Sequence, residues 1–363
     1  MASLLQLLFS GLEIGSIYAL ASLGIMLIFR TSTVTNFAQG IIGMFSAFFV
    51  AAFVMRTTNV VTFALIISAL MVIAITRLLY IKGIPLGLSI GISILPSYMF
   101  VLLIWLLGPS IWSATILGLI TAFLTGVLID FVIIRRAQKV NPLAKQIITM
   151  GLVIVFLGIT PMIFNKMLIG ADPVRIPKFI TEGAITISGA SLSYNSLFNI
   201  VVGLIIMIGL FVFLQKTKWG LAVRVTASNP QTAKMMGVPT KLVTVGSWAV
   251  AAMLGTLAAI MYAPIVGIIT PGYMTVIQVV AFVACVFGGF QTFHGPVIAA
   301  YIVAIVRNIL IFYGSSFLQI FFGSAIQSDF GSIWGEQILY ILIIILIIFR
   351  PYGLIGKKIV KKV

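Results

Sequence analysis

The chain has 363 residues, of which 61% are hydrophobic and only 8% are charged, and its formal net charge is +16. A typical soluble domain has about 25% charged residues, so this chain lacks the side chains for a water-exposed shell. Its Lys and Arg residues lie at the ends of apolar runs, as membrane topology requires, which argues against nucleic-acid binding. The runs are continuous rather than alternating, which excludes a transmembrane β-barrel. We therefore predict an all-α polytopic integral membrane protein.

About ten or eleven transmembrane helices are predicted, because roughly 20 apolar residues are needed for each crossing. Their ranges in chain order are 5–29, 37–55, 60–80, 84–107, 111–134, 147–165, 196–214, 242–263, 275–290, 296–313 and 336–349. The ninth is short, so it is either a full crossing or a re-entrant segment surrounded by protein. Glycine spacing predicts close helix packing at Gly11 and Gly15. The spacing of Gly83, Gly87 and Gly91 predicts the same in the fourth span.

The basic residues predict how the spans are oriented. With the N-terminus outside and the sides alternating, 17 of the 22 Lys and Arg residues fall in cytoplasmic segments, and 4 fall outside. Cytoplasmic loops carry such an excess. We therefore expect an outside N-terminus and a cytoplasmic C-terminus in one transmembrane domain, 1–363. No basic residue precedes Arg30, so the first span is expected to be retained rather than cleaved as a signal peptide.

A polar segment at 166–195 is predicted to lie outside the membrane. It contains a short stretch from Ala184 to Gly189 in which apolar and polar residues alternate, followed by further polar residues. Short alternation bounded by glycine is typical of a hairpin. We therefore expect a small β-hairpin on the extracytoplasmic membrane surface.

A second polar segment, 215–241, is predicted to be the longest cytoplasmic stretch. In it Ser228 or Asn229 can cap a helix that begins at Pro230, since proline loses no hydrogen bond at the first helical position. Gly237 can end that helix in a left-handed conformation. The helix would either rest on lipid headgroups or enter a groove of a partner. The side chains that it would offer to such a partner are Ala233, Met235 and Met236.

Few residues could carry chemistry. The single histidine, His294, and the single cysteine, Cys285, have no evident partners for a metal site or a catalytic dyad, and the chain has no GxxxxGK[ST] loop. We therefore predict no catalytic, cofactor-binding or metal-binding residue and no enzymatic activity. The acids lie near span ends, whereas ion-driven transporters usually place them at the midplane. Arg307, inside a span, either reaches an interface beside Asn308 or contributes to a substrate path.

Motifs along nearly the whole chain resemble one family. The stretch TKWGLAVRVTASNPQTAKMMGV resembles the cytoplasmic coupling loop of type II ABC-importer permeases, and the branched-chain amino acid permeases in particular. Four other motifs are also similar to patterns of this family: the GL…G..YAL stretch from Gly11, NFAQG at 36–40, the GG…G turn at 288–295 and the closing RPYGLIG at 350–356. Two features differ from the family: the residues inside the 288–295 turn and an excess of length around 56–109.

The resemblance implies the type II ABC-importer permease fold in a bacterial or archaeal cytoplasmic (inner) membrane. The chain would be one of two homologous permease subunits. Two cytoplasmic ATPase subunits would bind the ATP and dock on the coupling loop, while an extracytoplasmic solute-binding protein would deliver Leu, Ile or Val. The residues that the resemblance implies in ATPase coupling are Arg224, Ala227, Asn229, Pro230, Ala233, Met236 and Gly237.

A zwitterionic amino acid needs polar groups along its path through hydrocarbon. The candidates for that path are Asn36, Gln39, Gln278 and Asn308, for which helix capping or interhelical hydrogen bonding are the alternative roles. Other solutes stay open, namely sugars, nucleosides and amides such as urea. A secondary transporter or channel that works alone is a more distant alternative. Pairing with an identical or a different permease subunit also stays open.

Overall fold

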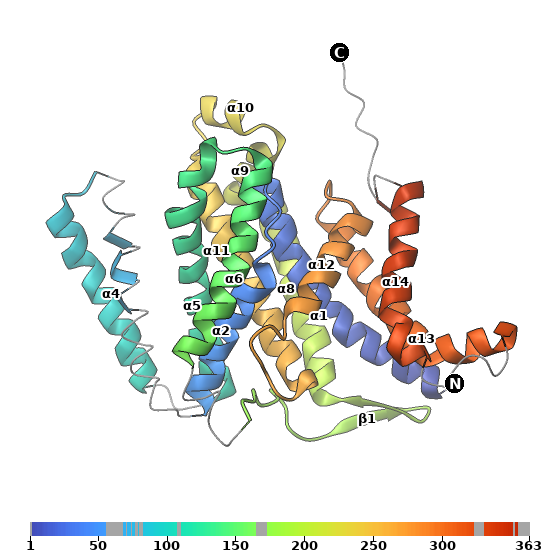
Figure 1. Cartoon of the computed structure of the whole chain (residues 1–363). Helices are drawn as coiled ribbons and strands as arrows, with labels where there is room; N and C mark the ends of the chain where they lie inside the picture. The colour runs from blue at the N-terminus through green and yellow to red at the C-terminus, as the bar shows by residue number, and fades with distance from the viewer. Residues whose placement is uncertain are drawn as a thin grey trace, which may run out of the picture.

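The computed structural model describes residues 2–55, 68–69, 71–73, 75–76, 79, 83–106, 110–164, 173–322, 330–350 and 353–354. Most of the predicted third span, 60–80, lies outside these residues, as do Arg56, Lys166 and the basic residues of 355–363. The described part is a helical bundle with one small hairpin (Figure 1).

The elements follow one another along the chain as helices with a single pair of strands between them. The first half holds α1 (Ala2–Ser32), α2 (Gln39–Val54), α4 (Leu86–Leu106), α5 (Ile111–Ile129), the π turn η1 (Asp130–Ile134), the 3-10 turn η2 (Arg136–Lys139) and α6 (Pro142–Ile163). The second half holds β1 (Ala184–Ile187), β2 (Ala190–Ser193), α8 (Tyr194–Lys216), α9 (Lys218–Ser228), α10 (Pro230–Met235), α11 (Thr240–Val266), α12 (Thr275–Gly288), α13 (His294–Phe322) and α14 (Phe330–Phe349).

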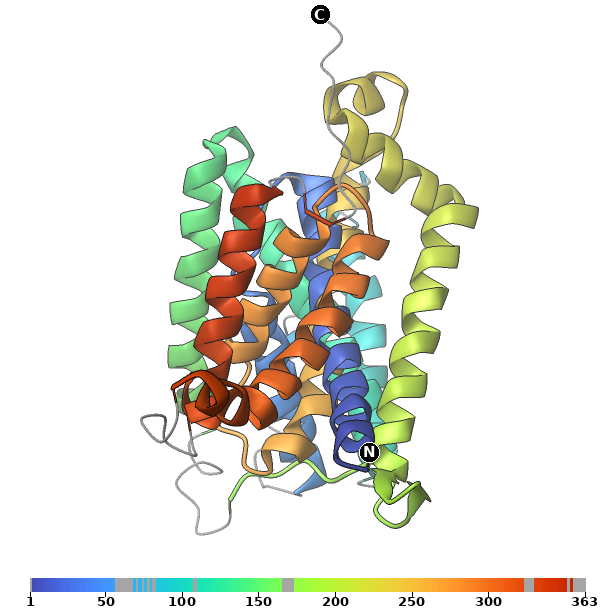
Figure 2. The same cartoon turned by 90° about the vertical axis from the view of Figure 1, so that its right-hand side faces the viewer.

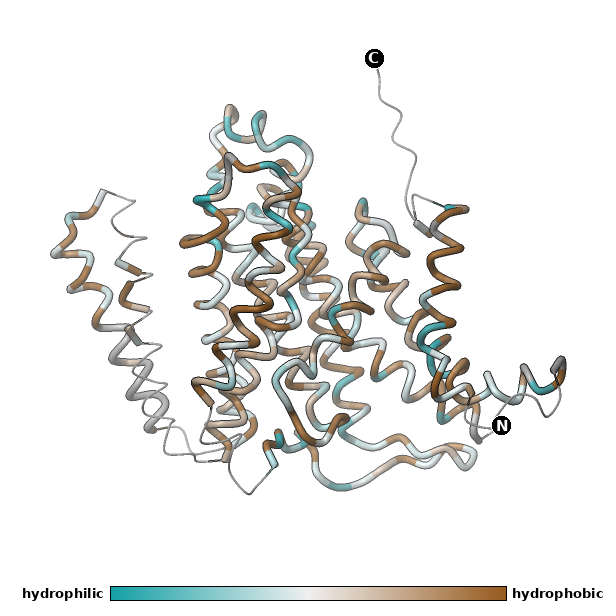
Figure 3. Tube along the Cα trace, viewed as in Figure 1, coloured by the Kyte–Doolittle hydropathy of each residue, from teal (hydrophilic) through white to brown (hydrophobic). Residues whose placement is uncertain are grey.

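The prediction of an all-α membrane protein is confirmed. Within the described residues, six helices are long and apolar enough to cross a bilayer: α1, α5 continued by η1, α6, α8, α11 and α13. Figure 3 shows apolar residues along the length of the helices and polar residues gathered near α9 and α10. A backbone in hydrocarbon must satisfy its own hydrogen bonds, which continuous helices do.

Helices α1 and α11 form the centre of the bundle. The apolar window of α1 is 83% buried and that of α11 is 61% buried, whereas those of α6 and α8 are 17% and 22% buried. Helix α1 packs against α8, α11, α12 and α13. Figure 2 shows α8 and α6 on opposite outer sides of the bundle. The peripheral helices therefore present apolar faces outward, as lipid contact requires.

Glycine packing differs between the two predicted series. A Cβ atom on Gly15 would lie 2.6 Å from Cδ1 of Tyr301, and one on Gly11 would lie 3.0 Å from Cγ1 of Ile305, so α1 and α13 approach closely as predicted. No described atom lies within 4 Å of a Cβ built on Gly87. Among the described residues, the close packing predicted for the fourth span is therefore not seen at this glycine, where α4 stands at the side of the bundle (Figure 1).

Two helices are too short to cross the membrane. Helix α2 has 16 residues and α12 has 14, which correspond to about 24 and 21 Å, against about 30 Å of hydrocarbon. Gln39, the first residue of α2, is 1% exposed, and Ile277 and Gln278 in the first turn of α12 are 0% and 6% exposed, whereas Thr275 and Val276 are exposed. Both helices therefore have one face of their first turn inside the bundle. The short ninth span is predicted correctly as short, whereas the range 37–55 overestimates α2.

The structure contains a hairpin in the segment 166–195. Strands β1 and β2 are antiparallel, with Ile187 opposite Ala190. Ser188 and Gly189 have φ angles of 51° and 84°, which fit the two-residue turn that matches strand twist. The backbone N–H of Ser191 donates to Oε1 of Gln6 at 2.8 Å. The hairpin and the start of α1 thus lie at one end of the bundle, and α10 lies at the other (Figures 1 and 2).

Candidate functional site

The segment α9–α10 is built by local capping. The side chain of Thr217 accepts a hydrogen bond from the N–H of Gly220 at 3.0 Å and begins α9. The side chain of Asn229 accepts from the N–H groups of Gln231 and Thr232, at 3.0 and 3.1 Å, and begins α10 with Pro230 as its first residue. A capped start satisfies donors that a short helix would otherwise expose. Both helices therefore hold their shape at the end of the bundle marked by α10.

The end of α10 is equally well defined. Gly237 has a φ of 80°, and its N–H donates to the carbonyl of Lys234 at 3.1 Å. The N–H of Val238 donates to the carbonyl of Ala233 at 3.0 Å. This pair of bonds forms a Schellman motif, in which glycine adopts the left-handed conformation with little strain. The helix predicted between Pro230 and Gly237 is therefore present.

Two methionines are exposed at the end of α10, where Gln231, Thr232 and Lys234 are exposed as well. Met235 is 88% exposed and Met236 is 73% exposed, whereas Ala233 is 0% exposed. The expectation that Ala233 is available to a partner is wrong, because α10 lies against α9 and α11 and this small side chain fits beneath it. Isolated exposed apolar residues are normal, but two adjacent methionines at a helix end form an adaptable contact surface.

The other residues predicted for coupling surround this helix. Asn229, Pro230 and Gly237 are exposed, and Ala227 is half-buried near the end of α9. Arg224 is exposed and its guanidinium donates to the carbonyl oxygen of Gln215 at 3.4 Å, at the end of α8. Apart from Ala233, these residues are therefore exposed or half-buried in α9, α10 and the turns beside them.

Three of the four residues predicted for a substrate path meet in one buried network. Nδ2 of Asn36 donates to Oε1 of Gln39 at 3.1 Å, and the N–H of Ala38 donates to Oδ1 of Asn36 at 3.0 Å. The N–H of Gly40, in the first turn of α2, donates to Oε1 of Gln278 on α12. Nε2 of Gln278 donates to the carbonyl of Asn36 at 3.4 Å. The NFAQG stretch is therefore the point where the two short helices are joined.

The side chain of Gln39 is enclosed by glycines. Its Nε2 donates to the carbonyl of Ala251 on α11. A Cβ on Gly24 of α1 would lie 2.4 Å from this nitrogen, and one on Gly255 of α11 would lie 2.9 Å from it. Only a missing side chain at these positions lets three helices close around the amide. Each of these amides carries donors and acceptors but no charge.

Asn308 lies elsewhere. Its Nδ2 donates to Oγ of Ser10 at 3.0 Å and to the carbonyl of Leu7 at 3.3 Å, both on α1. Sequence reasoning did not single out Thr149 of α6, whose hydroxyl accepts from the N–H of Phe37 and donates to the carbonyl of Thr35, each at 3.3 Å. A lone buried threonine in an apolar helix gives little sequence signal. Thr149 therefore joins α6 to the segment that precedes α2.

The charge of Arg307 is balanced by an acid on the next helix. Its Nε donates to Oε1 of Glu336 at 2.9 Å, and the two side chains are 20% and 30% exposed. The ion pair therefore explains how the charge of Arg307 is accommodated within a span, without a side chain that reaches the membrane interface and without a role in the substrate path. Opposite charges in consecutive predicted spans were the available signal. The pair joins α13 to α14.

Replacing Glu336 by Gln should lower the free energy of unfolding by about 1–3 kcal/mol, because it leaves the Arg307 cation without its partner inside the bundle. Replacing both residues, by Arg307→Gln together with Glu336→Gln, should cost less than the sum of the single changes. Thermal unfolding of the four proteins in detergent measures this coupling. Strict additivity would show that the pair contributes no interaction energy.

Two distant motifs meet at the α10 end of the bundle. The N–H of Leu354 donates to the carbonyl of Phe287 at 2.7 Å. A Cβ on Gly353, whose φ is 75°, would lie 2.7 Å from the backbone nitrogen of Gly289. The closing stretch after α14 is thus fixed against the glycine turn after α12, which explains why position 353 requires glycine.

Cys285 and His294, the residues considered for chemistry, lie in α12 and at the start of α13. Cys285 is buried and its thiol donates to the carbonyl of Ser22 at 3.3 Å. His294 is the first residue of α13. Within the described part of the chain, no three His, Cys, Asp or Glu residues gather as a metal site would require.

The comparisons with known proteins agree with the membrane architecture. The family described as "Branched-chain amino acid transport system / permease component" matches residues 78–348. The chain is 24% identical to the high-affinity branched-chain amino acid transport system permease protein BraD of Pseudomonas aeruginosa, over 99% of this chain and 98% of that protein. It is 22% identical to the permease protein LivH of Escherichia coli, over 99% and 97% of the two chains.

A shorter match has higher identity. The probable branched-chain amino acid transport permease protein LivH of Methanocaldococcus jannaschii is 28% identical over 43% of this chain and 46% of that protein. No solved structure matches the chain significantly. The family match covers well over half of the chain, and the relatives from Pseudomonas aeruginosa and Escherichia coli align over nearly all of it. The chain is therefore a multi-pass membrane protein that belongs to the branched-chain amino acid transport system permease family.

Proposed function

We propose that this chain is a membrane-spanning permease subunit of an ATP-driven ABC importer, and that the importer carries Leu, Ile and Val delivered by a binding protein. The chain would pair with a second homologous permease. Two ATPase subunits would bind the ATP in the cytoplasm, and this chain would hydrolyse none. The proposal places the α10 end of the bundle in the cytoplasm and the hairpin end outside, in line with the excess of basic residues.

The observation that carries the proposal is the doubly capped helix α10 with its exposed methionines. Met235, the last residue of this six-residue helix, and its C-cap Met236 are exposed at the end of the bundle where an ATPase subunit would bind. A protruding helix with apolar side chains is suited to a partner groove. A channel or an ion-driven transporter working alone would have no need of such an element.

The buried amide network supports the second half of the proposal. The network of Asn36, Gln39 and Gln278 links the first turn of α2 to the first turn of α12. Both helices are too short for a full crossing. Interrupted helices at mid-bundle are a common setting for solute sites in transporters. We propose that these amides line the path and hydrogen-bond the ammonium and carboxylate groups of the amino acid when the two helices separate.

The test is reconstitution of this chain with a second permease, its ATPase subunits and a binding protein in liposomes. Uptake of radioactive leucine should require ATP on the side of the liposome membrane where α10 lies. Excess unlabelled isoleucine and valine should suppress leucine uptake, whereas ribose, nucleosides and urea should not. Uptake driven by a proton or sodium gradient without ATPase subunits would contradict the ATP-driven mechanism. Competition by ribose or a nucleoside alone would contradict the choice of solute.

A further inference from the structure

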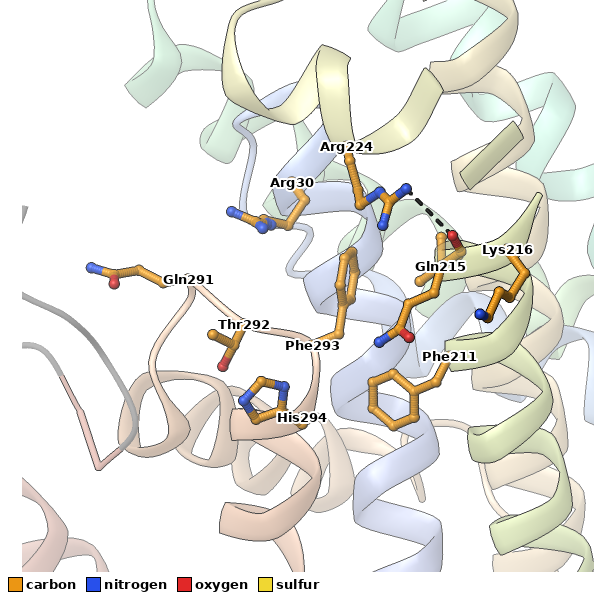
Figure 4. Close-up of a pocket in the computed structure, with 10 residues that line it drawn as sticks. Arg30, Phe211, Gln215, Lys216, Arg224, Gln291, Thr292, Phe293 and His294 are labelled. Atoms are coloured by element: carbon orange, nitrogen blue, oxygen red, sulfur yellow. Dashed lines mark hydrogen bonds between the residues drawn. The ribbon is translucent and has the colours of Figure 1, made fainter. Parts of the chain in front are cut away.

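A pocket of about 370 Å³ opens at the α10 end of the bundle. Figure 4 shows that its lining comes from the end of α1, the end of α8, the middle of α9 and the turn before α13. The polar and charged residues that matter here are Arg30, Lys216, Arg224, Gln291, Thr292 and His294. None of the lining residues is acidic.

The positive charge of this pocket is not balanced within the described residues. Their two ion pairs join Arg135 to Asp130 and Arg307 to Glu336, both away from the pocket. The Arg30 guanidinium lies 5.6 Å from the ring centroid of Phe293, and Arg224 donates to a backbone carbonyl. Neither contact neutralises a charge. Three cations around one cavity repel one another, so an anion bound there would be favoured.

Two buried polar atoms of the lining have no hydrogen-bond partner among the described residues. They are Nε of Arg30 and Oγ1 of Thr292. Buried polar groups in proteins are nearly always paired with protein or ligand. A guanidinium N–H and a hydroxyl are both suited to donate to an oxyanion. The unpaired atoms and the excess charge therefore point to the same kind of ligand.

An apolar stripe leads to the pocket along α8. Ile205, Ile208 and Val212 are exposed and lie three or four residues apart, on one helix face that ends at Lys216. Side chains at this spacing follow one another along a helix. Because α8 is a peripheral helix, an acyl chain can lie along the stripe while a headgroup reaches Lys216. This arrangement favours a lipid over a small soluble anion.

We propose that this pocket binds the phosphate group of an anionic ligand, supplied by the headgroup of a membrane lipid. The phosphate would accept hydrogen bonds from Arg30 and Thr292 and lie between Lys216 and Arg224. Binding would hold the corner between α8 and α9 and thereby steady the segment that carries α10. The proposal does not depend on which solute the protein carries.

The experiment is native mass spectrometry of the purified full-length protein in detergent, titrated with phosphatidylglycerol and with phosphatidylcholine. Phosphatidylglycerol should bind more tightly to the unsubstituted protein. The double variant Lys216→Gln, Arg224→Gln should bind it about 30-fold more weakly, since each basic residue near an anionic headgroup contributes roughly fivefold. The matched control Lys218→Gln, Lys241→Gln removes the same charge from exposed positions that do not line the pocket. It should bind almost as well as the unsubstituted protein.

A second arm separates the two sources of phosphate. If inorganic phosphate raises the melting temperature of the unsubstituted protein, but not of the double variant, and phosphatidylglycerol binds no better than phosphatidylcholine, the phosphate site stands and its lipid source is overturned. Equal losses in the pocket variant and the control would overturn the site, because diffuse charge would then explain binding. The site would also be overturned if the pocket substitutions weakened the binding of a protein partner and left the binding of lipid and of phosphate unchanged. If the double variant fails to fold, Lys216→Gln should still show about a fivefold loss.

Discussion

Replacing Met235 and Met236 together by aspartate is expected to abolish ATP-driven uptake while the protein still inserts and folds. Both side chains are more than two-thirds exposed and contact little of their own chain, so aspartate costs the isolated subunit little. In a partner groove the same change removes two apolar anchors and adds two buried charges. A hot-spot residue at the centre of an interface contributes about 2 kcal/mol or more, so the loss of two should lower the affinity for the ATPase subunit by about 700-fold.

The measurement is copurification and titration of the ATPase subunit with each variant, followed by leucine uptake in liposomes. The control is Met235→Leu with Met236→Leu, which keeps the apolar surface and should retain binding and uptake. Ala233 is a poor site for this test, since it is wholly buried and a large residue there would displace α10. Unchanged ATPase binding by the aspartate variant would remove the coupling role from α10.

Local features of this structure could be read from the sequence because they depend on neighbours a few residues apart. Asn229, Pro230 and Gly237 define α10 within nine residues, and the caps and the left-handed glycine form as their residue types predict. The hairpin follows in the same way from the alternation after Gly183. The sequence therefore predicts where these elements lie along the chain. It does not predict that Ala233 is buried, because that burial depends on how α10 packs against α9 and α11.

The candidate path illustrates the opposite case. The sequence marks Asn36, Gln39 and Gln278 as polar residues in apolar surroundings. It does not predict that these three side chains contact one another. The contact between Gly40 and Gln278 links positions 238 residues apart. Its existence depends on α2 and α12 both having one face of their first turn inside the bundle. Hydropathy counts apolar residues and carries no information on depth, so the range 37–55 looks like a full crossing.

The same limit applies to Arg307. Hydropathy identifies a cation inside a span, and its cost in hydrocarbon implies a partner. Which partner depends on how α13 and α14 pack, and that is set by long-range contacts such as Gly335 against Ile311. Asn308, its neighbour in sequence, faces α1 instead. Two adjacent polar residues thus have separate structural roles.

Replacing Gln39 by leucine is expected to lower the free energy of unfolding by about 2–4 kcal/mol and to abolish uptake. The leucine removes the acceptor of the Asn36 amide and the donor to the Ala251 carbonyl. It also places a branched side chain where Gly24 and Gly255 leave room only for a flat amide. The loss therefore combines unpaired polar groups with overpacking at the junction of α1, α2 and α11.

The matched control is Thr256→Val on α11. Thr256 is also fully buried, but its hydroxyl donates only to Ala252 within its own helix, at 2.9 Å. Its loss should cost less than about 1 kcal/mol, since the carbonyl keeps its helical hydrogen bond. Thermal unfolding and leucine uptake distinguish the two parts of the prediction. If Gln39→Leu were as stable and as active as Thr256→Val, the amide network would neither join the short helices nor line the path. If Gln39→Leu were destabilised but transported leucine normally, the network would serve only to join them.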